Sequence, residues 1–190
     1  MTEWISNTDW AILYGIQEHI RCAFLDAVMP VITFLGDAGI VWIIAALVMM
    51  FMAKFRRTGV VMAIGLVLGL LIGNLLLKNA VARERPCWLD SSVLMLVKVP
   101  KDFSFPSGHT LASVISATVL VFSDRRFAFA AIPLAVLIAF SRLYLFVHFP
   151  SDVFCGALLG LATGVAAWFL GGRLYDGAAK RIRERKQKAQ

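Results

Sequence analysis

Two of the three histidines in the chain, His109 and His148, lie where long apolar segments meet polar residues. His109 ends the tetrapeptide PSGH at 106–109, and His148 is followed four positions later by Asp152. Ionisable groups at a membrane edge are costly and usually mark a functional site. A carboxylate that accepts a hydrogen bond from one ring nitrogen leaves the other as a neutral nucleophile. We therefore predict that His148 is a nucleophile oriented by Asp152, with His109 as the general acid for the leaving oxygen.

Basic residues accompany these histidines and indicate an anionic substrate. Lys78, Arg85 and Arg142 supply positive charge near the ends of apolar segments. Ser107 and Gly108 open a helix, where main-chain N–H groups bind anions and glycine lets the backbone approach closely. Cleavage of a phosphate ester needs positive donors on the equatorial oxygens, an in-line nucleophile and an acid. The pattern therefore predicts a phosphate cradle.

Each of these groups also has a purely structural interpretation. Lys78 can extend to the membrane surface, Arg142 can hold a helix end, and Asp152 can be an acidic residue at a helix start. His109, His148 and Asp152 are also possible metal ligands, but three nearby basic residues would repel a cation. We therefore predict no metal and no cofactor.

The composition is that of a membrane protein. Of 190 residues, 59% are hydrophobic and 16% are charged, and the mean hydropathy is +0.77. A soluble domain is roughly half apolar and about a quarter charged. No linker or low-complexity tract divides the chain, so one membrane-embedded domain over 1–190 is expected. The three cysteines are far apart and form no CxxC, which predicts neither a disulfide framework nor a zinc site.

Five apolar stretches are candidates to cross a membrane, which takes roughly 20 residues. They are residues 38–53, 58–77, 103–123, 127–141 and 153–172. A weaker sixth, 22–36, contains Asp26 and Pro30, and residues 4–20 form an amphipathic pattern typical of an interfacial helix. The predicted fold is an all-α bundle of about six helices, with a helical core at 20–172 and a basic tail at 173–190.

Glycine recurs at every fourth position in two of these segments. The positions are Gly65, Gly69 and Gly73, and then Gly156, Gly160 and Gly164. Such spacing lets helices approach closely. Both runs lie beside polar clusters, which favours packing within the chain over a dimer seam. The oligomeric state stays open.

Three ordered motifs resemble the signatures of the type 2 phosphatidic acid phosphatase family. They are Lys78 with Arg85–Pro86, PSGH at 106–109, and Ser141–Arg142 with His148 and Asp152. The resemblance implies a metal-independent enzyme in which His148 forms a phosphohistidine, Asp152 orients it and His109 protonates the leaving group. It also implies a six-helix membrane bundle with the site at one membrane face. The phosphate would be held by Lys78, Arg85, Ser107, Gly108 and Arg142.

The substrate expected from this resemblance is a lipid phosphate in the bilayer. Undecaprenyl diphosphate is favoured by family analogy, and phosphatidylglycerophosphate, phosphatidate and lipid A remain alternatives. The family also includes soluble vanadate-dependent haloperoxidases, which the continuous apolar helices argue against. A non-catalytic binder or transporter of anionic lipids is the alternative from another class. Such a binder needs the arginines but has no need of His148 paired with Asp152.

The distribution of basic residues predicts the orientation in the membrane. Short loops rich in Lys and Arg stay in the cytoplasm. Twelve lie in the tail or in turns opposite the motifs: Lys54, Arg56, Arg57, Arg125, Arg126, Arg173, Lys180, Arg181, Arg183, Arg185, Lys186 and Lys188. Six lie on the motif side: Lys78, Arg83, Arg85, Lys98, Lys101 and Arg142. We therefore expect a plasma-membrane protein with a cytoplasmic C-terminus and an extracytoplasmic site. The tail is interpreted as an anchor near anionic lipid, and no nucleic-acid partner is expected.

Overall fold

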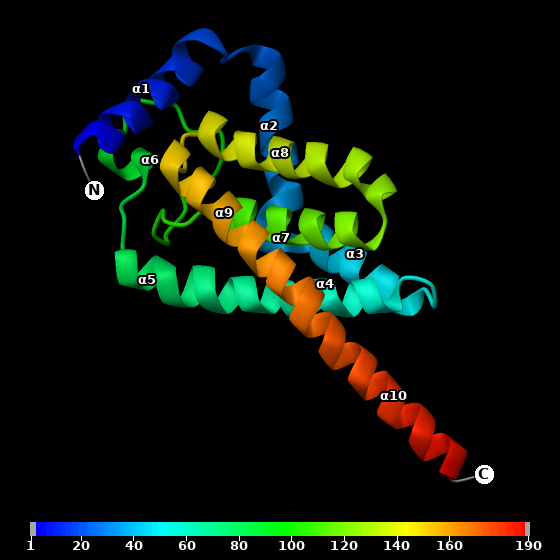
Figure 1. Cartoon of the computed structure of the whole chain (residues 1–190). Helices are drawn as coiled ribbons and strands as arrows, with labels where there is room; N and C mark the ends of the chain where they lie inside the picture. Colours follow the sequence, from blue (N-terminus) through cyan, green and yellow to red (C-terminus); the bar gives the residue numbers. More distant parts are fainter. Residues whose placement is uncertain (1–2, 189–190) are drawn as a thin grey trace.

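The computed structural model describes residues 3–188, within which every regular element is helical (Figure 1). The all-α prediction is therefore confirmed. The last two residues of the predicted tail and the first two of the chain, 1–2 and 189–190, lie outside the described part. The α-helices are α1 (Glu3–His19), α2 (Ala23–Gly36), α3 (Ile40–Phe51), α4 (Arg56–Gly69), α5 (Lys78–Val81), α6 (Pro86–Leu89), α7 (Gly108–Ser123), α8 (Ala128–Tyr144), α9 (Pro150–Ala166) and α10 (Gly172–Lys188).

Two π-helical segments join helices into longer rods. Segment η2 (Leu70–Leu77) connects α4 to α5, and η4 (Ala167–Gly171) connects α9 to α10. Within residues 3–188, four stretches are long and apolar enough to cross a membrane: Ala23–Phe51, Arg56–Leu89, Arg125–Tyr144 and Pro150–Lys188. Helix α7 is apolar but shorter, with 16 residues. The weak sixth segment of the sequence corresponds to α2, and the amphipathic segment corresponds to α1.

Several predicted boundaries are wrong, for local reasons. Helix α7 begins at Gly108 rather than at residue 103, because Ser107 is its extended N-cap and accepts a hydrogen bond from Thr110 N–H. The last helix does not end at Gly172 but continues to Lys188. Ala, Lys, Arg and Glu are good helix formers, and they dominate the residues that follow. The rod formed by α9 and α10 therefore projects well beyond the bundle (Figure 1).

Helix α7 is the centre of the bundle. It packs against α4, α8 and α9 and also contacts α2 and α3. Both glycine runs face it: a Cβ at Gly69 would lie 2.5 Å from Ile115 Cδ1, and one at Gly160 would lie 2.9 Å from the Leu111 carbonyl oxygen. These glycines therefore serve packing within the chain. They bring α4 and α9, which flank the polar clusters, onto the helix that carries PSGH.

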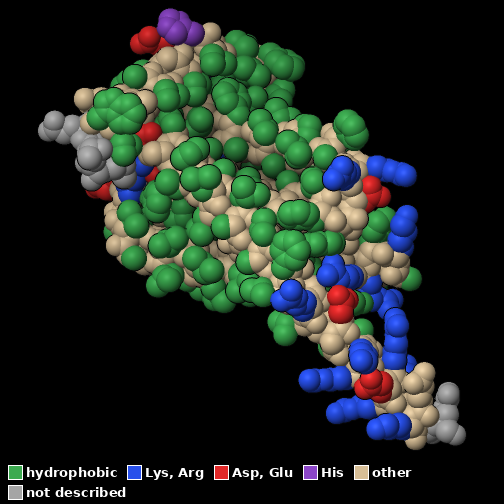
Figure 2. Space-filling model, viewed as in Figure 1, with side chains coloured by type: hydrophobic (Ala, Val, Ile, Leu, Met, Phe, Trp, Pro, Cys, Tyr) green, Lys and Arg blue, Asp and Glu red, His purple; other side chains and the backbone are tan. Residues whose placement is uncertain are grey.

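Helix α1 lies across the end of the bundle where α8 and α9 meet. Leu13 and Ile16 are buried against Phe146 and Phe149 of the segment that joins those helices. At the opposite end, Lys and Arg side chains gather along α10 and the neighbouring turns, whereas apolar side chains cover most of the body (Figure 2). The molecule therefore has one strongly basic end and a site-bearing end closed by α1.

Candidate active site

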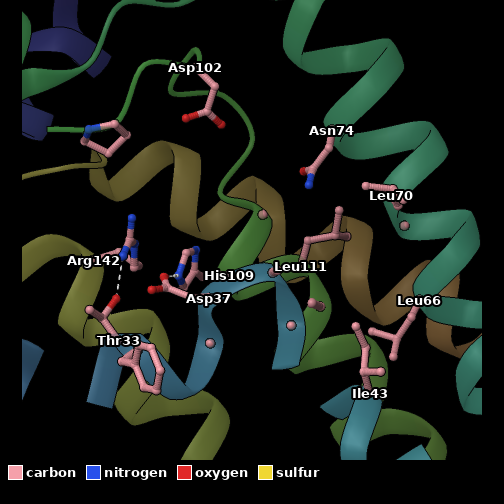
Figure 3. Close-up of a pocket in the computed structure, with 18 of the residues that line it drawn as sticks. Thr33, Asp37, Ile43, Leu66, Leu70, Asn74, Asp102, His109, Leu111 and Arg142 are labelled. Atoms are coloured by element: carbon pink, nitrogen blue, oxygen red, sulfur yellow. Dashed lines mark hydrogen bonds and ion pairs between the residues drawn. The ribbon is translucent and has the colours of Figure 1, made fainter. Parts of the chain in front are cut away.

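A cavity of about 1190 Å³ opens between α2, α3, α4, α7 and α8 (Figure 3). Six of the eight predicted site residues line it: Lys78, Arg85, Gly108, His109, Arg142 and His148. The other two, Ser107 and Asp152, are fully buried behind this wall. Packing therefore brings together residues that are up to 70 positions apart in the sequence.

His148 lies on the short segment between α8 and α9, and only 1% of its surface is exposed. Arg85 Nη1 is 3.0 Å from His148 Nε2. A guanidinium only donates, so Nε2 holds the lone pair and Nδ1 carries the proton. Burial, followed by the charges of Arg85 and Arg142, holds the pKa of His148 well below its usual value of 6.5. The ring is therefore neutral near pH 7, with an unprotonated nitrogen at the cavity, as a nucleophile requires.

The carboxylate of Asp152 reaches this ring through a hydroxyl group. Asp152 Oδ2 is 3.8 Å from His148 Nδ1, which is too long for a hydrogen bond. Ser104 Oγ lies 3.4 Å from that nitrogen and donates to Asp152 Oδ2 at 2.6 Å. Phe149 N–H also donates to Oδ2, at 2.9 Å. Because His148 precedes α9, it does not share a helical face with Asp152, which instead caps the helix from its third position.

A second buried network holds the other oxygen of Asp152. Arg83 Nη1 donates to Asp152 Oδ1 at 2.6 Å, and Arg83 Nη2 donates to Asp9 Oδ2 at 2.7 Å. The guanidinium lies 4.0 Å from the ring centroid of Phe149. Ser151 Oγ donates to Asp9 Oδ2 at 2.5 Å. Helix α1, expected only as an interfacial helix, therefore contributes a carboxylate behind the site.

Arg85 and Lys78 meet at one carboxylate. Lys78 Nζ is 2.5 Å from Asp102 Oδ2, and Arg85 Nη2 is 2.9 Å from Asp102 Oδ1. The remaining Arg85 donors are used by His148 and by the carbonyl oxygens of Asp102, Phe103 and Val147. Partial burial alone would raise the pKa of Asp102. The hydrogen bond from Lys78 and the charges of Lys78 and Arg85 outweigh it and lower that pKa to about 2. An anionic group therefore already neutralises two of the predicted phosphate ligands.

The other predicted phosphate ligands differ in whether their hydrogen-bond donors already have partners within the described residues. Arg142 donates to Thr33 Oγ1, while its Nε has no partner among residues 3–188. Ser107 N–H donates to the Asp152 carbonyl oxygen at 3.2 Å, and its hydroxyl caps α7. A Cβ at Gly108 would lie 2.8 Å from Asn74 Oδ1, so only glycine leaves this side of the cradle open. The unused donors of Arg142 and the start of α7 are therefore the groups most available to bind an anion.

The geometry supports nucleophilic attack on phosphorus. Comparison with known proteins indicates the same class of reaction. The model of the PAP2 superfamily matches residues 58–176, which contain all three motifs. The chain belongs to the PAP2 superfamily. The crystal structure of a transmembrane PAP2-type phosphatidylglycerolphosphate phosphatase from Bacillus subtilis superposes with a TM-score of 0.71 and 30% identity, over 93% of this chain and 88% of that one. Aquifex aeolicus LpxE superposes with a TM-score of 0.64 and 28% identity, over 82% of this chain and 92% of that one.

Curated relatives point to membrane phosphatases as well. An undecaprenyl-diphosphatase from Sulfolobus acidocaldarius is 31% identical over 78% of this chain and 71% of its own length. Phosphatidylglycerophosphatase B from Bacillus subtilis is 32% identical over 75% of this chain and 73% of its own length. This chain is accordingly a multi-pass membrane phosphatase.

The polar residues around this site that sequence reasoning missed include Asp9, Arg83, Ser104 and Asp102. Ser104 and Asp102 lie just before PSGH, and Arg83 lies inside the first motif. Nearness to the motifs was thus a usable signal for these three. Asp9 is more than 70 positions from every motif residue with which it pairs, and nothing in its local sequence distinguishes it.

Proposed function

We propose that this protein removes phosphate from a lipid whose tail stays in the membrane, with undecaprenyl diphosphate as the favoured substrate. The observation that carries the proposal is the continuity of the cavity. Figure 3 shows Arg142 and His109 on one side of the cavity and Ile43, Leu66 and Leu70 on the other, and Leu47 and Val67 also line it. A charged headgroup and an apolar tail fit such a site together. The named relatives support the same substrate class.

The proposed reaction has two steps. His148 Nε2 attacks phosphorus while the bond to the leaving oxygen breaks, and that oxygen takes a proton from His109. Lys78, Arg85 and Arg142, with the start of α7, stabilise the charge on the equatorial oxygens. A water molecule then attacks phosphorus and gives its proton to His109. The phosphorus–nitrogen bond breaks, and phosphate leaves with His148 neutral again.

Two substrate classes are compatible with the proposed reaction. A diphosphate is favoured because the named relatives include two undecaprenyl-diphosphatases, from Sulfolobus acidocaldarius and Bacillus subtilis. A glycerophospholipid phosphate is the second candidate, because the superposed Bacillus subtilis crystal structure is that of a phosphatidylglycerolphosphate phosphatase. The leaving groups differ: a lipid phosphate in the first case and an alkoxide in the second.

Release of inorganic phosphate from purified lipids tests the proposal. Undecaprenyl diphosphate, phosphatidylglycerophosphate and phosphatidate are compared in detergent micelles. We expect wild-type turnover on at least one of them and none with His148→Ala. His19→Ala is the matched control, because that ring is exposed and does not line the cavity. Turnover that survives His148→Ala would contradict the nucleophile, and no wild-type turnover on any of the three would contradict the proposed function.

We further propose that the chain is one membrane domain whose site faces the extracytoplasmic side of the plasma membrane. The basic end in Figure 2 supports a cytoplasmic tail. The test uses a variant without native cysteines that carries either Ser92→Cys or Gln187→Cys. An impermeant thiol reagent should label only Ser92→Cys in intact cells, and both after lysis. Labelling of only Gln187→Cys in intact cells would place the site in the cytoplasm.

A further inference from the structure

A carboxylate from outside the three motifs contacts the predicted general acid inside the cavity. Asp37 Oδ1 is 2.8 Å from His109 Nε2, and both side chains line the cavity beside Arg142 (Figure 3). An ionised carboxylate only accepts hydrogen bonds, so Nε2 carries the proton in this pair. The other nitrogen, Nδ1, makes no hydrogen bond within residues 3–188. It is the atom left free to serve a leaving group.

The chain breaks a membrane helix to bring this carboxylate into place. Segment η1 (Asp37–Gly39) separates α2 from α3, with φ of 50° at Ala38 and 70° at Gly39. A left-handed conformation is sterically unfavourable for a residue with a Cβ, such as Ala38. Such strain tends to gather at functional sites. The break therefore has a cost that a plain membrane helix would avoid.

The end of α2 also lies unusually close to the ring of His109. A Cβ added at Gly36 would lie 2.7 Å from His109 Cδ2 and 2.8 Å from Ile138 Cγ2. Glycine at this position therefore lets the backbone before Asp37 touch the imidazole. Two independent local features, the break and the glycine, serve the same contact.

The charges around His109 explain why it needs a carboxylate. Arg142 on α8, Arg85, and Lys78 on α5 line the same cavity, with His148 from the α8–α9 segment. Positive charges nearby disfavour a protonated imidazole. The other carboxylate lining the cavity, Asp102, is engaged by Lys78 and Arg85. Within residues 3–188, Asp37 is the carboxylate in direct contact with His109.

We propose that Asp37 is a positioning residue for the general acid, a role that rests on the proposed phosphatase function. It holds Nε2–H, directs Nδ1 toward the leaving oxygen and stabilises the doubly protonated ring. When the bond from phosphorus to the leaving oxygen breaks, its electron pair stays on that oxygen. The proton on Nδ1 moves to the same oxygen, and the ring remains neutral with Nε2–H bound to Asp37. An attacking water later returns a proton to Nδ1.

The kinetic test compares two leaving groups. Phosphatidate releases an alkoxide that needs a proton, whereas undecaprenyl diphosphate releases a phosphate that needs one far less. Asp37→Asn should lower kcat/KM for phosphatidate about 10- to 100-fold, within the range of general acid catalysis, and for the diphosphate about 3-fold or less. The control is Asp26→Asn on the preceding helix α2, whose carboxylate accepts a hydrogen bond from Tyr144 Oη and does not line the cavity. Equal losses on both substrates would overturn the assignment.

A double variant separates positioning from a general structural role. In a His109→Ala background, Asp37→Asn should change the phosphatidate rate by less than about 2-fold, because the residue on which it acts is missing. Losses that multiply in the double variant would show that Asp37 acts on something other than His109. The thermal midpoint of each variant, measured by size-exclusion after heating, shows whether the protein is folded.

A spectroscopic measurement tests the positioning role of Asp37 without requiring turnover. The chain has only three histidines, so ring ¹⁵N signals of histidine-labelled protein can be assigned with His19→Ala and His148→Ala. We expect His109 to be protonated at Nε2 at pH 8 and to lose this preference in Asp37→Ala. An unchanged tautomer would overturn the proposal. Absence of phosphate release by the wild type would instead count against the proposed function, so the two failures are distinguishable.

Discussion

Removal of the Asp102 charge should tighten the binding of phosphate-like anions. This carboxylate forms ion pairs with Lys78 and Arg85, two of the three cations predicted to hold the substrate phosphate, and occupies donors that a bound phosphate would use. Because the pKa of Asp102 is about 2, it stays ionised and competes over the whole physiological pH range. Asp102→Asn keeps the shape of the side chain and removes the charge.

The size of the effect follows from the same pKa. A value of about 2 in place of 3.8 corresponds to about 2.4 kcal/mol of attraction, at about 1.36 kcal/mol for each pH unit. Asp102 is 56% exposed, so solvent screening reduces this to roughly 1 kcal/mol. The dissociation constant of an anion that displaces the carboxylate should therefore fall about 5-fold.

The assay is competitive inhibition by orthovanadate, which mimics five-coordinate phosphorus. We expect the inhibition constant of Asp102→Asn to be about 5-fold lower than that of the wild type. Asp90→Asn is the control, because Asp90 lies in the same interhelical segment and accepts from Tyr14 and Ser92 instead. An unchanged or higher inhibition constant would refute the reasoning. It would mean that Asp102 holds Arg85 in place for phosphate rather than competing with it.

Three other predictions concern the nucleophile and its surroundings. Ser104→Ala should lower kcat about 10-fold with little change in KM, because the hydroxyl links His148 Nδ1 to Asp152; the same loss in a Ser91→Ala control would contradict this. Phosphatase activity should survive a strong chelator. If the chelator abolished the activity and one divalent metal restored it, the metal-free interpretation would be wrong. Because the pKa of His148 is held below 6.5, the buried ring stays neutral while an unfolded chain would take up a proton below that pH. Stability should therefore be full above pH 6.5 and fall below it. The thermal midpoint between pH 8 and 5 should fall less in His148→Gln, and an equal fall in both proteins would argue against this cause.

Much of the site could be predicted from the sequence because the residues proposed to carry its chemistry lie in short motifs. Lys78, Arg85, His109 and His148 lie at or near the ends of apolar segments, and their polar types conflict with a plain membrane helix. That conflict is enough to indicate a functional site from residue types alone. The helical fold was predictable for the same reason, since long apolar runs in a bilayer must satisfy their backbone groups internally.

Helix boundaries were less predictable, because hydropathy does not record where a cap forms. Residues 103–107 are uncharged like the helix that they precede, but the helix begins only after Ser107, whose side chain caps it by accepting a hydrogen bond from Thr110 N–H. Conversely, the last apolar stretch was expected to end at residue 172, and the helix continues beyond it through the π-helical segment η4 into α10. These outcomes depend on local hydrogen bonds rather than on composition.

The sequence by itself determined the reaction class through three ordered motifs, and it predicted the groups that we propose to face phosphorus. Only the tertiary structure decided which carboxylates contact the basic and histidine side chains around the site. Asp9, Asp37 and Asp102 are ordinary acidic residues in the sequence, and they reach Arg83, His109 and Lys78 across distances of 24 to 74 positions. A single side chain carries no periodic signal, and its partner is fixed by how α1, α2 and the segment before α7 pack at the end of the bundle. The chemistry is therefore local in the sequence, while its electrostatic control arises from long-range packing.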